Sequence, residues 1–200
     1  MALPPLPDGF RPGISLLAYL LLLLWVLWVI DCLLGRRLSA PLSIHPRSWM
    51  GLPGIVVAPL FHQDLKHLAA NSAPFVILGS LILFQGLSIL ALVTGFCWLF
   101  SGFLSWLLGR PGSRHLGISG VIFGYLGFIL LRGYFTQSLP AIALAGLVAI
   151  LYGGCLWGLL PLQRGKSWVG HSSGFLAGAI AARHLESMQT WWMGNMNWPG

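Results

Sequence analysis

The stretch Leu116-Gly-Ile-Ser119-Gly-Val-Ile-Phe123-Gly-Tyr-Leu-Gly-Phe-Ile-Leu-Leu131 is apolar along nearly its whole length and contains no charged residue. A helix needs about 20 such residues, at about 1.5 Å each, to cross the hydrocarbon core of a bilayer. Stretches of this kind therefore predict membrane-spanning helices. The sequence predicts six of them, at residues 14–34, 65–84, 87–108, 116–131, 139–160 and 168–182.

The composition of the whole chain agrees with these spans. Of the 200 residues, 56% are hydrophobic and 8% are charged, whereas a soluble domain carries roughly 25% charged residues. So few charges cannot cover a surface that faces water. We therefore expect one all-α polytopic membrane domain over residues 1–200, with its core at about 14–185. The sequence sets no oligomeric state.

The charges and the cysteines argue against other classes of protein. The net charge of +7 comes from basic residues that lie singly or in pairs between apolar stretches. This pattern is typical of loops in contact with lipid head groups and offers no patch for nucleic acid. Cys32, Cys97 and Cys155 lie in apolar stretches without metal or redox spacing, so we expect three buried thiols and no disulfide framework.

Two segments lie outside the predicted spans. Residues 35–61 form a long connection whose second half is apolar but interrupted by proline and glycine. Because irregular backbone at membrane depth is stable only against protein or a water-filled cavity, we expect a partly membrane-embedded loop beside the helices. The tail at 186–200 holds Trp191, Trp192 and Trp198, which predicts an interfacial aromatic anchor.

Polar side chains inside the spans identify a candidate site, because such groups are costly in lipid. His67, Ser119 and His171 lie near the starts of the second, fourth and sixth spans, and Asn71 lies one turn after His67. Consecutive spans run in opposite directions, so these three spans run the same way. We therefore expect the hydroxyl and both imidazoles at one depth on one side of the membrane.

These residue types fit nucleophilic catalysis. A serine hydroxyl needs an adjacent base to take its proton, and His171 can serve because free histidine has a pKa of about 6.5. His67 and Asn71 are spaced i, i+4 on one helix face and could join the Ser119 N–H in binding an oxyanion. No acidic residue lies near His171 in sequence, so a dyad is expected. Asp64 fits a helix N-terminal charge better than a catalytic acid.

Glycines after both catalytic candidates predict close helix packing. Gly120 follows Ser119, and Gly174 and Gly178 follow His171 at helical spacing. Small residues allow helix axes to approach in lipid, so the fourth and sixth spans are expected to pack through them. Leucine at position 178 should then separate the helices, and alanine should be much milder.

Three motifs together resemble the rhomboid family of intramembrane serine proteases. They are His62-Gln-Asp-Leu-Lys-His67-Leu-Ala-Ala-Asn71 on the second span, Gly117-Ile-Ser119-Gly120 on the fourth, and Gly170-His171-Ser-Ser-Gly174-Phe-Leu-Ala-Gly178 on the sixth. Each motif is weak alone, but their order and their places on alternate spans are specific. The resemblance extends over residues 61–183.

The resemblance implies a six-transmembrane-helix rhomboid-like bundle, a multi-pass protein of a bacterial inner membrane. It also implies cleavage of transmembrane protein substrates without a metal or cofactor, with Ser119 and His171 as the dyad and His67 and Asn71 as oxyanion ligands. Structural support is implied for His62, Gly117, Gly120, Phe123, Gly174 and Gly178. Phe123 replaces a common tyrosine but still offers a ring for His171 to stack on. Pro53-Gly54 stands where the first loop often carries Trp-Arg.

Other functions explain these residues less well. An intramembrane metalloprotease would need His-Glu-x-x-His, and no glutamate precedes Glu186. A haem protein could use His67 and His171 as axial ligands but would not need Ser119. The main alternative is a non-catalytic rhomboid-like protein that binds transmembrane clients. In such a protein Ser119, His171 and Asn71 would serve helix packing and hydrogen bonding.

The basic residues and the resemblance disagree about orientation in the membrane. Cytoplasmic loops carry an excess of basic residues, which would place the Ser119 face toward the cytoplasm, whereas the resemblance implies an active site that faces outward. We favour the outward orientation. The Ser119 face has Arg36, Arg37, Arg47, Lys66, Arg110, Arg114, Arg164 and Lys166, and the opposite face has Arg11, Arg132 and Arg183.

Overall fold

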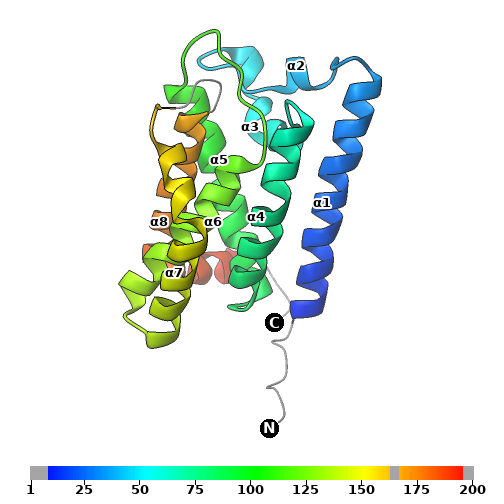
Figure 1. Cartoon of the computed structure of the whole chain (residues 1–200). Coiled ribbons are helices and arrows are strands. Elements are labelled where there is room, and N and C mark those ends of the chain that lie inside the picture. The colour runs from blue at the N-terminus through cyan, green and yellow to red at the C-terminus, as the bar shows by residue number, and fades with distance from the viewer. Residues whose placement is uncertain (1–8, 163–166, 196–200) are drawn as a thin grey trace.

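The structure, a computed structural model, describes residues 9–162 and 167–195, and every regular element in these residues is a helix. The long helices lie side by side, with α1 at one edge of the molecule and α7 and α8 at the other (Figure 1). In chain order the elements are α1 (Phe10–Leu33), α2 (Ser39–Leu42), η1 (Trp49–Gly51), α3 (Gly54–Val57), η2 (Ala58–Leu60), α4 (Leu65–Leu83), α5 (Leu87–Leu108), α6 (Ser119–Thr136), α7 (Leu139–Tyr152), η3 (Gly153–Leu159) and α8 (Trp168–Asn195).

Five helical segments are long and apolar enough to cross a membrane: Phe10–Leu33, Leu65–Leu83, Leu87–Leu108, Ser119–Thr136 and Leu139–Leu159. They confirm five of the predicted spans and an all-α polytopic bundle. The sixth predicted span lies in the first half of α8, which packs along α6. Within the described residues α8 is not among those five segments, so the count of six stays a prediction.

The centre of the bundle is α6, which packs against α4, α5, α7 and, most extensively, α8. The backbones of α6 and α8 touch. A β-carbon on Gly174 would overlap the carbonyl oxygen of Gly120, and one on Gly178 would overlap that of Gly124. These four residues, the glycine interface, confirm the predicted close packing. They leave no room for a methyl group, which argues against the expectation that alanine at position 178 is much milder than leucine.

The connection at 35–61 covers one side of α5 and forms only short helical turns. The indole N–H of Trp98 on α5 donates to the carbonyl oxygen of Val56 at 2.9 Å. Trp49 and Met50 are 86% and 79% exposed, which suits contact with lipid at the interface. The loop therefore lies beside the helices, where protein groups satisfy its irregular backbone.

Two expectations from the sequence differ from the structure. Cys97 is buried, but Cys32 is half-buried and Cys155 is exposed, so the prediction of buried thiols is wrong for those two. Cys155 belongs to η3, which has no buried residue. The predicted tail begins as helix, because α8 continues through a kink at His184 to Asn195. Trp198 lies outside the described residues.

Candidate active site

The hydroxyl of Ser119 and the imidazole of His171 meet at the same end of two parallel helices. Ser119 is the first residue of α6, and His171 lies in the first turn of α8. Their Oγ and Nε2 atoms are 3.1 Å apart, and the residues are 8% and 7% exposed. The distance is that of a hydrogen bond between a nucleophile and its base.

A backbone carbonyl sets the tautomer of His171. The Nδ1 atom lies 3.1 Å from the carbonyl oxygen of Gly158 in η3. A carbonyl oxygen only accepts hydrogen bonds, so Nδ1 carries the proton and Nε2 presents a lone pair to Ser119. An aspartate does the same in a catalytic triad. Sequence reasoning missed Gly158, because a backbone acceptor leaves no signal in residue type.

The His171 ring is also held by packing. Phe123 stacks on it with a centroid distance of 4.2 Å and an interplanar angle of 12°. The Ser172 hydroxyl donates to the carbonyl oxygen of Leu159 at 2.7 Å, which ties the start of α8 to η3. A β-carbon on Gly158 would lie 2.9 Å from the Phe123 ring and 3.3 Å from the His171 Nδ1. The His171 ring therefore has little freedom to turn.

His67 and Asn71 lie on α4, which Asp64 caps by accepting from the His67 N–H at 2.8 Å. Asn71 is 9% exposed, and its Nδ2 has no hydrogen-bond partner among the described residues. A buried donor without a partner is costly. The Asn71 amide is thus available to an acceptor that enters the site.

A left-handed glycine brings the serine loop against His67. Gly117 has φ of 104°, a conformation that favours glycine, and a β-carbon there would lie 2.7 Å from His67 Cε1. Its N–H donates to the Ala58 carbonyl oxygen at 3.0 Å. The sequence motif named Gly117 for support, and its backbone angle gives the physical reason.

His62 lies behind His67, fully buried, with ring centroids 5.2 Å apart. Neither of its ring nitrogens has a hydrogen-bond partner among the described residues. Burial, and to a smaller extent the nearby His67, lower the pKa of His62 to about 3. His62 is therefore neutral at ordinary pH. The Arg36 guanidinium donates to its carbonyl oxygen at 2.9 Å.

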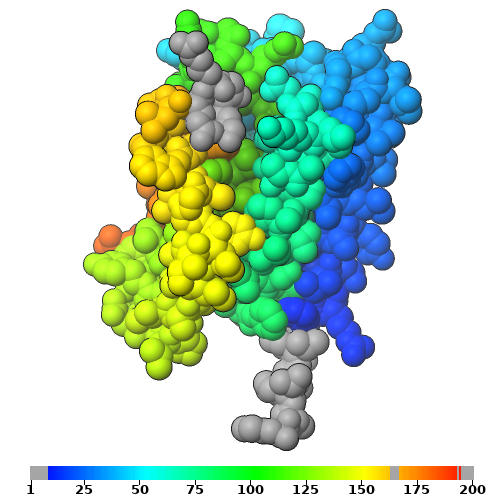
Figure 2. Space-filling view, viewed as in Figure 1, coloured from blue at the N-terminus to red at the C-terminus, as the bar shows by residue number. Residues whose placement is uncertain are grey.

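A cleft of about 870 Å³ lies between α4 on one side and α7 with η3 on the other, with α6 at its floor (Figure 2). Polar groups line the end that holds the dyad, and apolar groups line the rest. The polar lining includes His67, Asn71, Ser119 and His171, and the apolar lining includes Pro74, Leu78, Ile122 and Leu126. The cleft thus combines a polar end with an apolar part, as expected of a site where lipid meets water.

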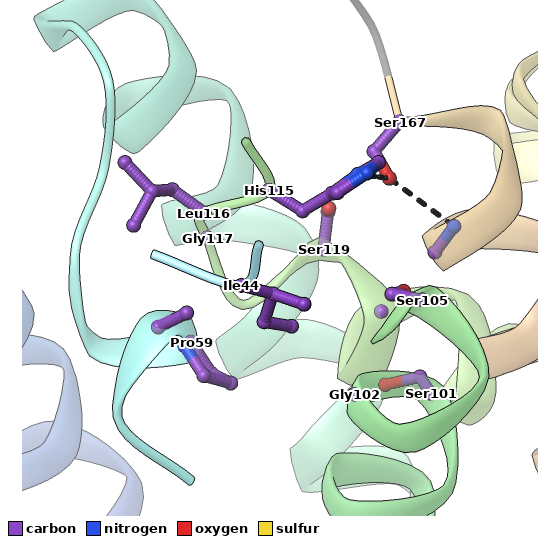
Figure 3. A pocket seen from close by; sticks show the side chains of 13 residues that line it. Ile44, Pro59, Ser101, Gly102, Ser105, His115, Leu116, Gly117, Ser119 and Ser167 are labelled. Atoms are coloured by element: carbon purple, nitrogen blue, oxygen red, sulfur yellow. Dashed lines mark hydrogen bonds between the residues drawn. The ribbon is translucent and has the colours of Figure 1, made fainter. Parts of the chain in front are cut away.

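A smaller cavity of about 30 Å³ also reaches Ser119 (Figure 3). The side chains of Ser101, Ser105, His115 and Ser167 contribute to its lining. A water molecule needs roughly 10–15 Å³ of such space and two to four polar partners. The cavity therefore has both the room and the hydrogen-bonding groups for a water beside the serine hydroxyl.

Residues 48–186 match the rhomboid domain family. An uncharacterized protein of Mycobacterium tuberculosis is 39% identical over 183 residues, which cover 88% of this chain and 75% of that protein. An uncharacterized protein of Mycobacterium leprae is 35% identical over 208 residues, covering 94% and 82%. These bacterial relatives and the apolar helices indicate an integral, multi-pass protein of the inner membrane. Because the match to the rhomboid domain covers more than half of the chain, the chain belongs to the rhomboid family.

Proposed function

We propose that the protein is an intramembrane serine endopeptidase that cleaves transmembrane protein substrates with a Ser119–His171 dyad. One observation carries the proposal. His171 Nε2 lies 3.1 Å from Ser119 Oγ, and the bond from Nδ1 to the Gly158 carbonyl turns the lone pair of Nε2 toward the hydroxyl. A packing serine needs no oriented base, whereas a nucleophile does.

The reaction follows from these positions. His171 Nε2 takes the hydroxyl proton as Ser119 Oγ attacks the peptide carbonyl carbon. The oxyanion is stabilised by the Ser119 N–H at the very start of α6, where a helix offers no internal partner, and by Asn71 and His67. The His171 imidazolium then gives its proton to the leaving amine. Water, deprotonated by His171, hydrolyses the acyl-enzyme and regenerates Ser119.

The shape of the cleft supports a membrane-spanning substrate. Its apolar part runs along α4 and α6, where lipid or a substrate helix would supply apolar contact. Its polar end holds the dyad and admits water, which hydrolysis requires. A peptide bond must leave its helical hydrogen bonds to reach Ser119, and the polar end offers donors to replace them.

The test is cleavage of a labelled transmembrane substrate by the purified protein in detergent. Wild type should cleave it, and Ser119→Ala and His171→Ala should each abolish cleavage while melting like the wild type. Ser80→Ala is a control, because Ser80 lies near the far end of α4 and donates to the Val76 carbonyl oxygen of its own helix; it should cleave like the wild type. Ordinary turnover by Ser119→Ala would refute the mechanism.

The same cleft would also hold a transmembrane client without cleaving it, which keeps non-catalytic binding as the second candidate. A fluorophosphonate separates the two, because it labels only a serine activated by a base. Labelling of wild type but not of Ser119→Ala supports the enzyme. Client binding without labelling at Ser119 would support the binding protein.

A further inference from the structure

The two groups of the dyad lie at helix ends, where helices fray. Ser119 is the first residue of α6, and His171 lies in the first turn of α8. The glycine interface begins after both of them, at Gly120 and Gly174. The glycine interface sets the distance between the axes of α6 and α8, but Ser119 and His171 lie just before it in their helices. The segments that carry these two residues therefore need a further contact to hold them together.

A hydrogen bond between two loop residues supplies this attachment. His115 precedes Ser119 by four residues, and Ser167 precedes His171 by four. The His115 Nδ1 and Ser167 Oγ atoms are 2.6 Å apart. Figure 3 shows both side chains beside Ser119, at the wall of the small cavity. The bond therefore joins the segment that leads into α6 to the segment that leads into α8.

The hydrogen bonds around His115 have one consistent direction. The Gly170 N–H donates to Ser167 Oγ at 3.2 Å, so the Ser167 hydroxyl proton is free to go to His115 Nδ1. The opposite ring nitrogen, Nε2, lies 2.9 Å from Ser113 Oγ, which in turn donates to the Arg110 carbonyl oxygen at 2.6 Å. Each donor and acceptor in this series of hydrogen bonds has a partner. Burial lowers the pKa of His115, which favours the neutral ring that these hydrogen bonds require.

Backbone bonds fix both ends of the attachment. His115 exchanges two hydrogen bonds with Ile44 of the first loop, at 3.0 and 3.1 Å. On the other side, the His171 N–H donates to the Ser167 carbonyl oxygen at 3.0 Å. Ser167 thus holds α8 through both its hydroxyl and its carbonyl, and one of these bonds is to the catalytic histidine itself.

We propose that the His115–Ser167 hydrogen bond holds the starts of α6 and α8 in register and so keeps Ser119 and His171 within bonding distance. The inference rests on the proposed function. His115 and Ser167 are positioning residues that act through the dyad. A displacement of about 1 Å at a reacting group can lower a rate about a hundredfold, and loss of the bond frees two loop segments to move by such amounts.

The experiment measures the rate of fluorophosphonate labelling at Ser119, together with kcat, KM and melting temperature for a transmembrane substrate. His115→Phe and Ser167→Ala should each slow labelling and lower kcat by roughly ten- to hundredfold, with KM little changed. The double variant should lose clearly less than the sum of the two single losses, because both changes remove the same His115–Ser167 bond. Ser167→Thr keeps the hydroxyl and should restore most of the rate.

His45→Phe is the matched control, because His45 bonds to the hydroxyl of Ser43 at 3.0 Å within the first loop. It should label at the wild-type rate. Equal labelling of the wild type, His115→Phe and Ser167→Ala would overturn the inference, as would effects that add in the double variant or appear in KM alone. If His115→Phe does not fold, Ser167→Ala against Ser167→Thr decides. Absence of labelling in the wild type would instead refute the proposed function.

Discussion

A single backbone carbonyl decides whether His171 presents a lone pair or a proton to Ser119. Gly158 holds that carbonyl at 3.1 Å from Nδ1, and a β-carbon at this position would press on the Phe123 ring at 2.9 Å. We predict that Gly158→Ala displaces either the Gly158 carbonyl or the Phe123 ring and lowers turnover by about tenfold or more. The measurement is kcat on a transmembrane substrate.

Gly153→Ala is the control for this change, since Gly153 lies in the same 3-10 segment, a β-carbon there meets nothing within 4 Å, and Gly153 does not line the cleft. It should leave turnover unchanged. The nitrogen chemical shifts of labelled His171 give a second readout, because they distinguish an Nδ1–H ring from an Nε2–H ring. A wild-type ring protonated at Nε2 would contradict the assigned role of Gly158.

His62 predicts how stability responds to acid. Its pKa in the folded protein is about 3, below the ordinary value of 6.5, so burial of the neutral ring favours the fold fully above pH 6.5. That contribution is lost as pH falls from 6.5 toward 3, by about 1.4 kcal/mol per pH unit at most. Between pH 6.5 and 5 the free energy of unfolding should fall by up to about 2 kcal/mol.

The corresponding variant is His62→Leu, which removes the titrating group from a fully buried place. Its melting temperature should depend less on pH between 7.5 and 5 than that of the wild type. Ser119→Ala serves as a reference, because it removes no group that titrates in this range and should keep the wild-type dependence. Parallel curves for wild type and His62→Leu would show that another group is responsible.

At this scale the sequence located the groups that are unusual in lipid. His67, His171 and Asn71 could be selected because, away from the span ends, ionisable and amide side chains are rare in the apolar spans. Ser119 was selected by the motif Gly117-Ile-Ser119-Gly120, since several other serines also lie in the spans. Gly158 could not be selected, since its contribution is a carbonyl that every residue has. The polar partners His115 and Ser167 lie in loops, where hydroxyls and imidazoles are common, so their proximity appears only in three dimensions.

At the scale of helices, the glycine interface makes the most demanding contact. A β-carbon on Gly178 would overlap the carbonyl oxygen of Gly124 and lie 2.7 Å from the Phe128 nitrogen. Backbone atoms cannot turn away as a side chain does, so we predict that even Gly178→Ala separates α6 from α8. The expected cost is about 1–3 kcal/mol of stability, as for overpacking elsewhere, and turnover should fall because the dyad spans these two helices.

The series to measure is melting temperature and turnover for alanine, valine and leucine at position 178. Gly95 in α5 offers the matched series, because a β-carbon there meets nothing within 4 Å. Substitutions at Gly95 should be tolerated. If both measurements stayed level across the Gly178 series, α8 would not pack through this glycine, and the route by which the helices align the dyad would be wrong.

Helix boundaries could be predicted where the hydropathy of the sequence changes, but not where a backbone angle fixes the end of the helix. The predicted span at 116–131 begins at Ser119 in the structure, because Gly117 with φ of 104° cannot lie in a helix. The end of α8 was also missed. Residues 183–195 continue the helix past the kink at His184, but they are too polar to register as a span.

At the scale of the whole molecule, the arrangement of helices determines where the substrate of the proposed reaction would enter. The sequence predicted the five apolar helices seen in the described residues and brought His67, Ser119 and His171 to one end of the bundle. Apart from the glycine-bearing faces of α6 and α8, it could not predict which helices are neighbours, because apolar faces in lipid all look alike. The structure places α6 in the centre and leaves the cleft between α4 and the segment of α7 and η3, so access from the side of the bundle follows from packing.

This route of access leads to a prediction about Cys155, which lines the cleft and is exposed, whereas Cys97 is buried and Cys32 is half-buried. A bulky maleimide on Cys155 should occupy the space between η3 and α4. Cleavage of a transmembrane substrate should then fall by about tenfold or more, because a substrate helix needs the whole width of the cleft. A small fluorophosphonate needs only the polar end, so it should still label Ser119. Cys155→Ser is the control and should cleave equally with and without the maleimide. Equal loss of cleavage and labelling would mean that the adduct disturbs the dyad, and no loss of either would mean that substrates reach Ser119 by a path that avoids this cleft.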